Sequence, residues 1–247
     1  MSVIEVHGVS KRYRKDLQPL FHMSLKTFFL DGFRQKLKEP AALVWALQDV
    51  DFKVAKGTTL GIIGRNGSGK STLLRLMAGI LKPDTGSIEI RGQVAPLIEL
   101  GAGFHHEMTA RDNIIVNGMI LGLSKNTIKA RVDTIIDFAE LRHVLDDPIR
   151  TFSTGMVMRL GFSVAIHVDP EILIMDEILA VGDVAFRRKC FERLELFKHD
   201  GKTMVVVSHD LNLVRSWCDE AMWLEAGIMK IFGHPGDVVD AYLRECG

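Results

Sequence analysis

Residues 64–71 combine three glycines with a lysine and two serines, between an apolar run at 59–63 and a helix-compatible stretch at 72–78. Glycines let consecutive backbone N–H groups converge on phosphate oxygens, and the N-terminus of a following helix adds positive potential. In such a loop Lys70 would reach the β- and γ-phosphates, and Ser71 would bind Mg²⁺. The alternative is a glycine-rich turn with an exposed lysine. The residues that we expect to contact nucleotide here are Gly64, Arg65, Asn66, Gly67, Ser68, Gly69, Lys70, Ser71 and Thr72.

Two adjacent carboxylates, Asp176 and Glu177, follow a second apolar run at 172–175. A pair of carboxylates at the end of a buried strand needs a cation or a proton to offset its charge. A Mg²⁺ ion held through water by Asp176 meets that need, and it leaves Glu177 to polarise the water that attacks the γ-phosphate. Taken alone, this pair would more often begin a solvated loop. Its combination with the loop at 64–71 favours catalysis.

Short apolar runs alternate with longer segments of helical periodicity, which predicts an α/β fold with a parallel sheet covered by helices. The clearest buried strands are the runs at 59–63, 172–175 and 204–207, and polar residues follow each of them. Ligands bind at the carboxyl edge of open parallel sheets, so these polar residues should meet at one site.

The expected organisation is a single domain with an inserted helical part. The P-loop NTPase core would comprise residues 1–95 and 169–234, the helical subdomain residues 96–168, and a terminal helix residues 235–247. Residues 127–141 are the clearest helix-compatible stretch within that subdomain.

The composition is that of an ordinary globular protein, with 47% hydrophobic residues and 31 basic residues balancing 31 acidic ones. This balance disfavours nucleic-acid binding. The apolar runs are far shorter than the roughly 20 residues needed to cross a bilayer, and residues 1–7 lack the features of a secretory signal. We therefore expect a cytosolic chain that is not itself a permease. The three widely spaced cysteines fit reduced thiols and receive no chemical role.

Residues 152–156, Phe-Ser-Thr-Gly-Met, precede a helix expected over 157–167. Ser153 can cap that helix, and Gly155 can let backbone approach a phosphate. A plain Ser-capped helix would be favoured if this were the only clue. In its order between the phosphate loop and Asp176, the segment resembles the signature motif of ABC transporter ATPases, usually Leu-Ser-Gly-Gly-Gln. Ser153 and Gly155 match that motif outright, and we expect Ser153, Thr154 and Gly155 to contact nucleotide.

The resemblance to ABC ATPases covers nearly the whole chain and implies roles for four more residues. Asp183, at the end of a segment similar to the D-loop, would couple two ATP sites, and His209 would contact the γ-phosphate. A lone histidine after a strand is usually structural, but its place in the motif order favours this role. Tyr13 resembles the aromatic residue that stacks on adenine, with an ordinary packed tyrosine as the alternative. Glu99 stands in place of the family's Q-loop glutamine and is the expected Mg²⁺ ligand there.

Several departures from the general family resemble one branch, whose members export O-antigen, capsule or teichoic-acid chains. These departures are Glu99 within 97–104, the signature Ser-Thr-Gly-Met, and the segments 45–47 and 178–183. The implied function is ATP hydrolysis that powers polysaccharide export. One alternative is the ATPase of an importer or of a drug or lipid exporter, which shares the catalytic residues. A soluble ABC ATPase of repair or translation is less favoured, since those usually carry a coiled-coil insertion or two ATPase units.

The resemblance also implies partners and a location. Two copies would pack head to tail, with each ATP between the Lys70 loop of one and the Ser153–Gly155 segment of the other. The pair would sit on membrane permease subunits at the cytoplasmic face of the bacterial inner membrane and meet the polysaccharide only indirectly. Some branch members carry a C-terminal carbohydrate-binding domain, which we do not expect in a chain that ends at Gly247.

Residues 21–37 form the least typical segment, inside an insertion over 15–44. Phe21, Leu25, Phe28, Phe29 and Phe33 recur at mostly helical spacing, and residues 11–38 carry eight basic side chains against two acidic ones. Basic residues beside an apolar stripe favour anionic headgroups, so we expect an amphipathic helix against the membrane or the permease. The alternative is a helix packed on its own ATPase core.

Overall fold

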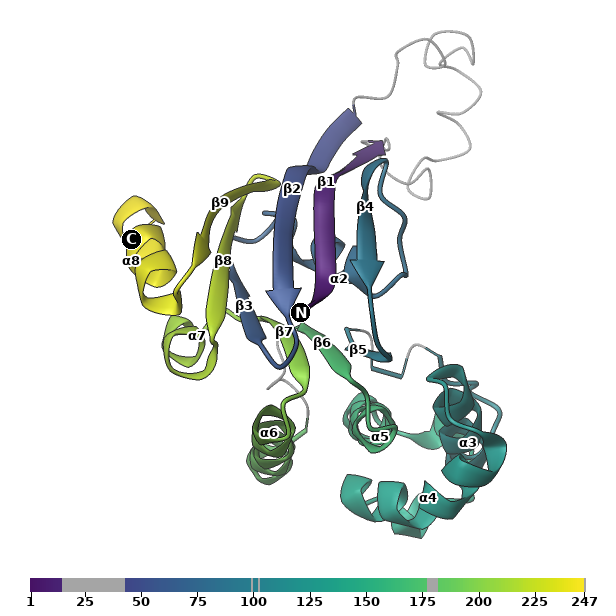
Figure 1. Cartoon of the computed structure of the whole chain (residues 1–247). Helices are drawn as coiled ribbons and strands as arrows, with labels where there is room; N and C mark the ends of the chain where they lie inside the picture. The colour runs from purple at the N-terminus through teal and green to yellow at the C-terminus, as the bar shows by residue number, and fades with distance from the viewer. Residues whose placement is uncertain (15–42, 99, 102, 177–181, 247) are drawn as a thin grey trace, which may run out of the picture.

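The computed structural model describes residues 1–14, 43–98, 100–101, 103–176 and 182–246. The predicted amphipathic helix at 21–37 lies outside these ranges. Within them, two β-sheets form the core, and Figure 1 shows the helices α3 to α8 arranged around one side and one end of it.

The larger sheet has the strand order β5-β6-β7-β3-β8-β9. Neighbouring strands are parallel except for the antiparallel pair β8 and β9. The strands are β3 (Thr59–Ile63), β5 (Val94–Leu97), β6 (Ile172–Asp176), β7 (Thr203–Val207), β8 (Glu220–Glu225) and β9 (Ile228–Gly233). The predicted α/β class with a parallel-rich sheet is confirmed, as are the three buried strands predicted at 59–63, 172–175 and 204–207.

The smaller sheet is antiparallel, with the order β2-β1-β4. It comprises β1 (Ser2–Arg14), β2 (Leu43–Ala55) and β4 (Thr85–Ile90). Alternate residues of β1, namely Ile4 and Val6, are fully buried, as expected for a strand with one face on the core.

Alternation along the parallel strands divides the core into two apolar layers. Ile172 and Ile174 face the cluster that includes α2 (Lys70–Met77) and the small sheet, whereas Leu173 and Met175 face the opposite cluster. The helices that cover this second face are α5 (Thr154–His167), α6 (Val184–His199), α7 (Leu211–Trp217) and α8 (Pro235–Cys246).

A third apolar cluster holds the helical part of the chain together. It joins α3 (Ala110–Ile120), α4 (Lys125–Ala139) and one side of α5, with the short 3₁₀ helices η2 (Arg142–Val144) and η3 (Ile149–Thr151) between them. Leu160 lies in this cluster and Phe162 in the core beneath the large sheet, so α5 packs on both parts. Figure 1 shows these helices at one end of the molecule.

Two boundaries differ from those expected from the sequence. Strand β5 runs through Leu97, which pairs with Met175, so the sheet extends past the expected start of the helical part at residue 96. Helix α5 begins at Thr154 instead of residue 157, because the hydroxyl of Ser153 accepts a hydrogen bond from the Met156 N–H at 3.3 Å.

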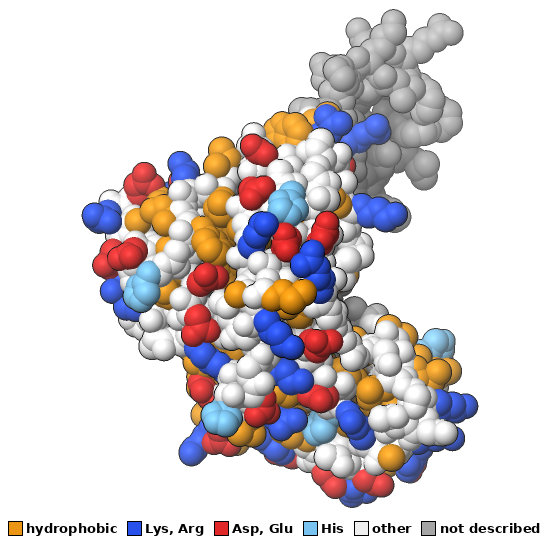
Figure 2. Space-filling model, viewed as in Figure 1, with side chains coloured by type: hydrophobic (Ala, Val, Ile, Leu, Met, Phe, Trp, Pro, Cys, Tyr) orange, Lys and Arg blue, Asp and Glu red, His pale blue; other side chains and the backbone are white. Residues whose placement is uncertain are grey.

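Charges of both signs are interspersed over the face drawn in Figure 2. Of the helices in the described ranges, none combines the length and apolarity needed to cross a membrane.

Candidate functional site

The predicted phosphate loop connects β3 to α2 and depends on glycine at two positions. Gly64 has φ 150° and Gly69 has φ 105°, values that L side chains rarely adopt. A Cβ atom on Gly64 would lie 2.1 Å from the carbonyl oxygen of Leu224, and one on Gly69 would lie 2.3 Å from that of Ala46. The loop is therefore pressed against neighbouring backbone, and a larger residue at either position would displace it.

Lys70, the first residue of α2, is held over this loop. Its side chain is buried, and its Nζ donates hydrogen bonds to the carbonyl oxygens of Gly64 at 2.7 Å and Arg65 at 2.9 Å. The capping residue Gly69 has no side-chain acceptor for the first turn, and the first turn carries no acidic residue. An ammonium group at an uncapped helix N-terminus forms a site suited to an anion such as phosphate.

Ser71 and Asp176 connect the loop to the end of β6. The hydroxyl of Ser71 donates a hydrogen bond to Oδ2 of Asp176 at 2.9 Å. A hydroxyl and a carboxylate are oxygen ligands of the kind that Mg²⁺ prefers, and this ion commonly takes its remaining ligands from phosphates and water. In the described ranges, no group of three or more His, Cys, Asp or Glu side chains could hold a metal ion on its own.

A pocket of about 510 Å³ brings together predicted residues from four segments of the chain. It lies where β3, β6 and β7 end, which is the carboxyl edge of the parallel strands. Its lining residues are Tyr13, Ala46, Asn66, Gly67, Gly69, Lys70, Ser71, Thr72, Ile98, Asp176, Val207 and His209. The structure thus brings the phosphate loop, Asp176, His209 and Tyr13 together.

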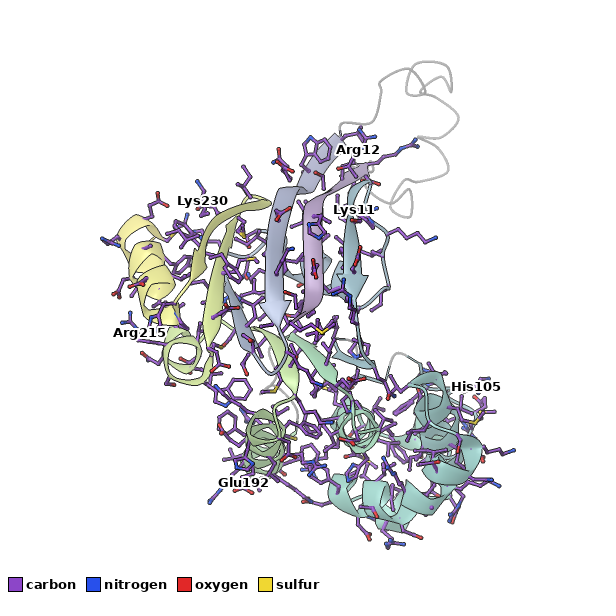
Figure 3. All side chains as sticks on the ribbon, viewed as in Figure 1. Lys11, Arg12, His105, Glu192, Arg215 and Lys230 are labelled. Atoms are coloured by element: carbon purple, nitrogen blue, oxygen red, sulfur yellow. The ribbon has the colours of Figure 1, made fainter. Side chains whose placement is uncertain are left out.

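Tyr13 borders this pocket from the outer end of β1, with 41% of its surface exposed. The preceding residues are anchored: the Arg12 N–H donates to Oδ2 of Asp84 at 2.8 Å, and Lys11 Nζ donates to Oδ1 at 3.2 Å. The Arg12 N–H, followed by the Lys11 ammonium, lowers the pKa of Asp84. Figure 3 shows Lys11 and Arg12 at this end of the strand. The exposed ring of Tyr13 is therefore held at the pocket by a fixed strand end.

The predicted signature residues are not part of the pocket. Ser153 caps α5, and Thr154 and Gly155 are its first two residues; within the described ranges neither Ser153 nor any residue of α5 lines the pocket. Of the described atoms, the nearest to a Cβ built on Gly155 would be Ser153 Oγ at 3.9 Å. The packing of this chain alone therefore does not require glycine at that position.

Asp183 also lies outside the pocket, at the start of α6. Its Oδ1 accepts a hydrogen bond from the Phe186 N–H at 2.9 Å, and its Oδ2 accepts one from Arg159 at 2.5 Å. The pKa of Asp183 is lowered, first by the Phe186 N–H and then by the nearby Arg159 charge, against an opposing effect of burial. Glu177 and Glu99 lie outside the described residues.

The sequence reasoning missed three apolar residues of the pocket. Ala46, Ile98 and Val207 line it, and each is an ordinary hydrophobic residue in a strand or next to one. Their residue types carry no chemical signal, although Ile98 lies in the same stretch as the predicted Glu99.

Comparisons with known proteins bear on the family and on the fold. Residues 47–180 match a family model described as ABC transporter. The chain is 42% identical to an O-antigen export system ATP-binding protein of Klebsiella pneumoniae, over 97% of both chains. A protein with the same description from Myxococcus xanthus is 46% identical, over 98% of this chain but 56% of that relative. A teichoic acids export ATP-binding protein of Bacillus anthracis is 39% identical, over 97% of this chain and 42% of the relative.

Solved structures share the fold. A dimeric ATP-binding cassette in a post-hydrolysis state, bound to ADP and phosphate, superposes with a TM-score of 0.72 at 21% identity, over 94% of this chain and 98% of that one. An ATP-binding subunit of an ABC transporter gives a TM-score of 0.75 at 23% identity, over 100% of this chain and 95% of that one.

Proposed function

The chain belongs to the ABC transporter family, and from that premise we propose that it hydrolyses ATP to power export of a surface polysaccharide across the bacterial inner membrane. The observation that carries the proposal is the convergence of Lys70, Ser71, Asp176 and His209 on one pocket at the edge of the parallel sheet. The polymer class rests on the relatives, whose descriptions name O-antigen and teichoic acid export.

ATP would lie with its phosphates over the loop between β3 and α2 and its adenine on Tyr13. The Lys70 ammonium already lies over the loop, where it donates to two carbonyl oxygens, so it can donate to a phosphate oxygen without a large movement of the side chain. Backbone N–H groups of the loop and of the first turn of α2 would bind the remaining phosphate oxygens. Tyr13 would add stacking area at the open side of the pocket.

For hydrolysis, the chain supplies groups that hold and deprotonate water. Ser71 and Asp176 would hold Mg²⁺, which offsets the negative charge that develops on the transferred phosphoryl group. The Glu177 carboxylate, which directly follows Asp176, would orient the attacking water and accept its proton. His209, at the pocket wall after β7, would donate a hydrogen bond to the γ-phosphate.

A second copy of the chain would complete the site. Ser153 and Gly155 do not line the pocket of their own chain, and a side chain at Gly155 would meet no close obstacle there, which supports a role for them against the ATP of a partner. Gly155→Asp places a carboxylate where the partner's γ-phosphate would lie. It should abolish ATP-dependent dimerisation in sedimentation experiments while each monomer still binds nucleotide. An unchanged dimer would reject the shared site.

The energy of this cycle would be passed to permease subunits, placing the protein at the cytoplasmic face of the membrane. In the bacterium that encodes the chain, a Glu177→Gln substitution should remove the polymer from the cell surface and leave it accumulated inside. An unchanged surface polymer would reject the export function, while ATP hydrolysis by the purified protein would still identify the ATPase of another importer or exporter.

A further inference from the structure

Arg159 on α5 is the centre of an ion-pair network that joins three helices. Its guanidinium contacts Asp183 at the start of α6 at 2.5 Å and Glu140 at the end of α4 at 3.0 Å. Lys189 of α6 completes the network with a contact to Glu140 at 3.3 Å. Figure 1 shows α4, α5 and α6 at the same end of the molecule. The network therefore bridges the helical part and the helix that follows β6.

The guanidinium is enclosed more tightly than those of ordinary surface pairs. Its side chain is 17% exposed, and it lies over the ring of Phe186 at 4.8 Å from the ring centroid. Gly182, with φ 69°, passes so close that a Cβ atom there would lie 3.1 Å from Arg159 Nε. Exposed ion pairs contribute little because water and salt screen them. Here the guanidinium is shielded from water, whereas the side chain of its partner Asp183 is 64% exposed.

The two carboxylate oxygens of Asp183 bind different partners. One oxygen caps α6 through the Phe186 N–H, and the other binds Arg159. The cap alone would fix where α6 begins, but the second contact fixes the carboxylate and its loop relative to α5. Arg159 thus sets the spacing between the starts of α5 and α6.

Arg159 also lies one helical turn beyond the first residues of α5. Gly155 and Arg159 are four residues apart in α5, so they lie on the same face of the helix, about one turn apart. From these contacts we infer that Arg159 is a positioning residue, which holds Asp183 and the Ser153–Gly155 segment in one fixed arrangement toward a second copy. This inference rests on the proposed ATP-bridged dimer.

An arginine fits this task better than a lysine. Its planar fork reaches two carboxylates from different nitrogens while its face stacks on Phe186, and a lysine ammonium offers neither the fork nor the flat surface. We therefore expect Arg159→Lys to retain the charge but not the arrangement.

The test measures ATP-dependent dimerisation of variants made in a Glu177→Gln parent, which we expect to bind ATP without hydrolysing it. Each variant is compared with that parent. Arg159→Met should leave the ATP affinity of the monomer within about twofold, because Arg159 does not line the pocket. It should weaken ATP-dependent dimerisation about tenfold or more, because the dimer must then order Asp183 without the charge-assisted hydrogen bond that holds it in the monomer. The matched control is Arg188→Met, which removes the 82% exposed partner of Glu192 on α6 and should change neither value.

A double-mutant cycle separates positioning from general stability. If Arg159 acts through Asp183, Arg159→Met combined with Asp183→Asn should weaken the dimer no more than the stronger single substitution. Arg159→Lys should restore at most part of the affinity. If Arg159→Met does not fold, Glu140→Gln loosens the same guanidinium while leaving its Asp183 contact, and should weaken the dimer less.

The outcomes are distinguishable. A parent that binds ATP but does not dimerise would reject the proposed shared site, and this inference with it. A parent that dimerises, together with an Arg159→Met variant that dimerises equally well, would reject the inference alone. So would strictly additive losses in the cycle, or a monomer affinity that falls as far as dimerisation does.

Discussion

Replacing Lys70 with methionine removes one charge from the pocket and keeps most of the side-chain length. In the structure this ammonium is buried and donates to the carbonyl oxygens of Gly64 and Arg65. On nucleotide binding we expect it to donate to phosphate oxygens instead. The substitution should therefore reduce nucleotide affinity much more than it changes the fold.

The expected size follows from the energy of one charge-assisted contact. A hydrogen bond to a charged group contributes about 1.5–3 kcal/mol, and about 2.7 kcal/mol corresponds to about 100-fold in affinity. At a ligand concentration of about 100 times the wild-type Kd, binding stabilises the wild type by about 2.7 kcal/mol and the variant by about 0.4 kcal/mol. For a chain of this size, 1 kcal/mol shifts Tm by about 2–4 °C. The ligand should thus raise Tm by about 5–11 °C in the wild type and by about 1 °C in the variant.

The assay is thermal unfolding with and without a non-hydrolysable ATP analogue. Lys202→Met is the matched control, because Lys202 forms an ion pair with Asp169 and neither residue lines the pocket. The control should keep the full ligand-induced shift. An equal shift in Lys70→Met and the wild type would show that the loop does not bind phosphate through this lysine.

Two further predictions concern other parts of the chain. Burial raises the pKa of both Cys190 and Cys218 to about 12, so these thiols stay protonated at pH 8. A thiol reagent should therefore label native protein at Cys246 alone and all three cysteines after unfolding. Rapid labelling of either buried thiol in native protein would contradict the packing. Replacing Phe28 and Phe29 with serine should leave Tm and ATPase rate unchanged but abolish permease-coupled activity or membrane association, whereas a large drop in Tm would favour a helix packed on its own core.

The parallel strands at the centre of the large sheet could be predicted from the sequence because nearly all their residues are apolar. Strands buried on both faces, such as β3 and β7, are continuous apolar runs that no surface element resembles. The antiparallel sheet was not predicted. Its strands β1 and β2 place buried residues between partly buried or exposed ones and carry many charges, so their apolar pattern is weaker. Their pairing also joins residues far apart in the chain.

The candidate site likewise contains residues that the sequence predicts and residues that it does not. Lys70, Ser71 and Asp176 belong to motifs whose residue order carries the chemistry, and the structure brings them together. Arg159 belongs to no predicted motif, and its role depends on contacts with Glu140 and Asp183 that only tertiary packing creates. The expectation that Ser153 and Gly155 serve the ATP of the other copy came from the family resemblance alone, because residue order within one chain does not specify which copy supplies a contact.

The most direct test of ATP hydrolysis is phosphate release by the purified full-length chain, compared with Glu177→Gln, with ATP binding measured on the same samples. The account predicts that the wild type releases phosphate and that Glu177→Gln binds ATP equally well. Turnover of the variant should fall by about 10²–10⁴-fold, the usual contribution of a general base. Wild-type rates of phosphate release from Glu177→Gln, or no ATP-dependent phosphate release from the wild type, would contradict the account.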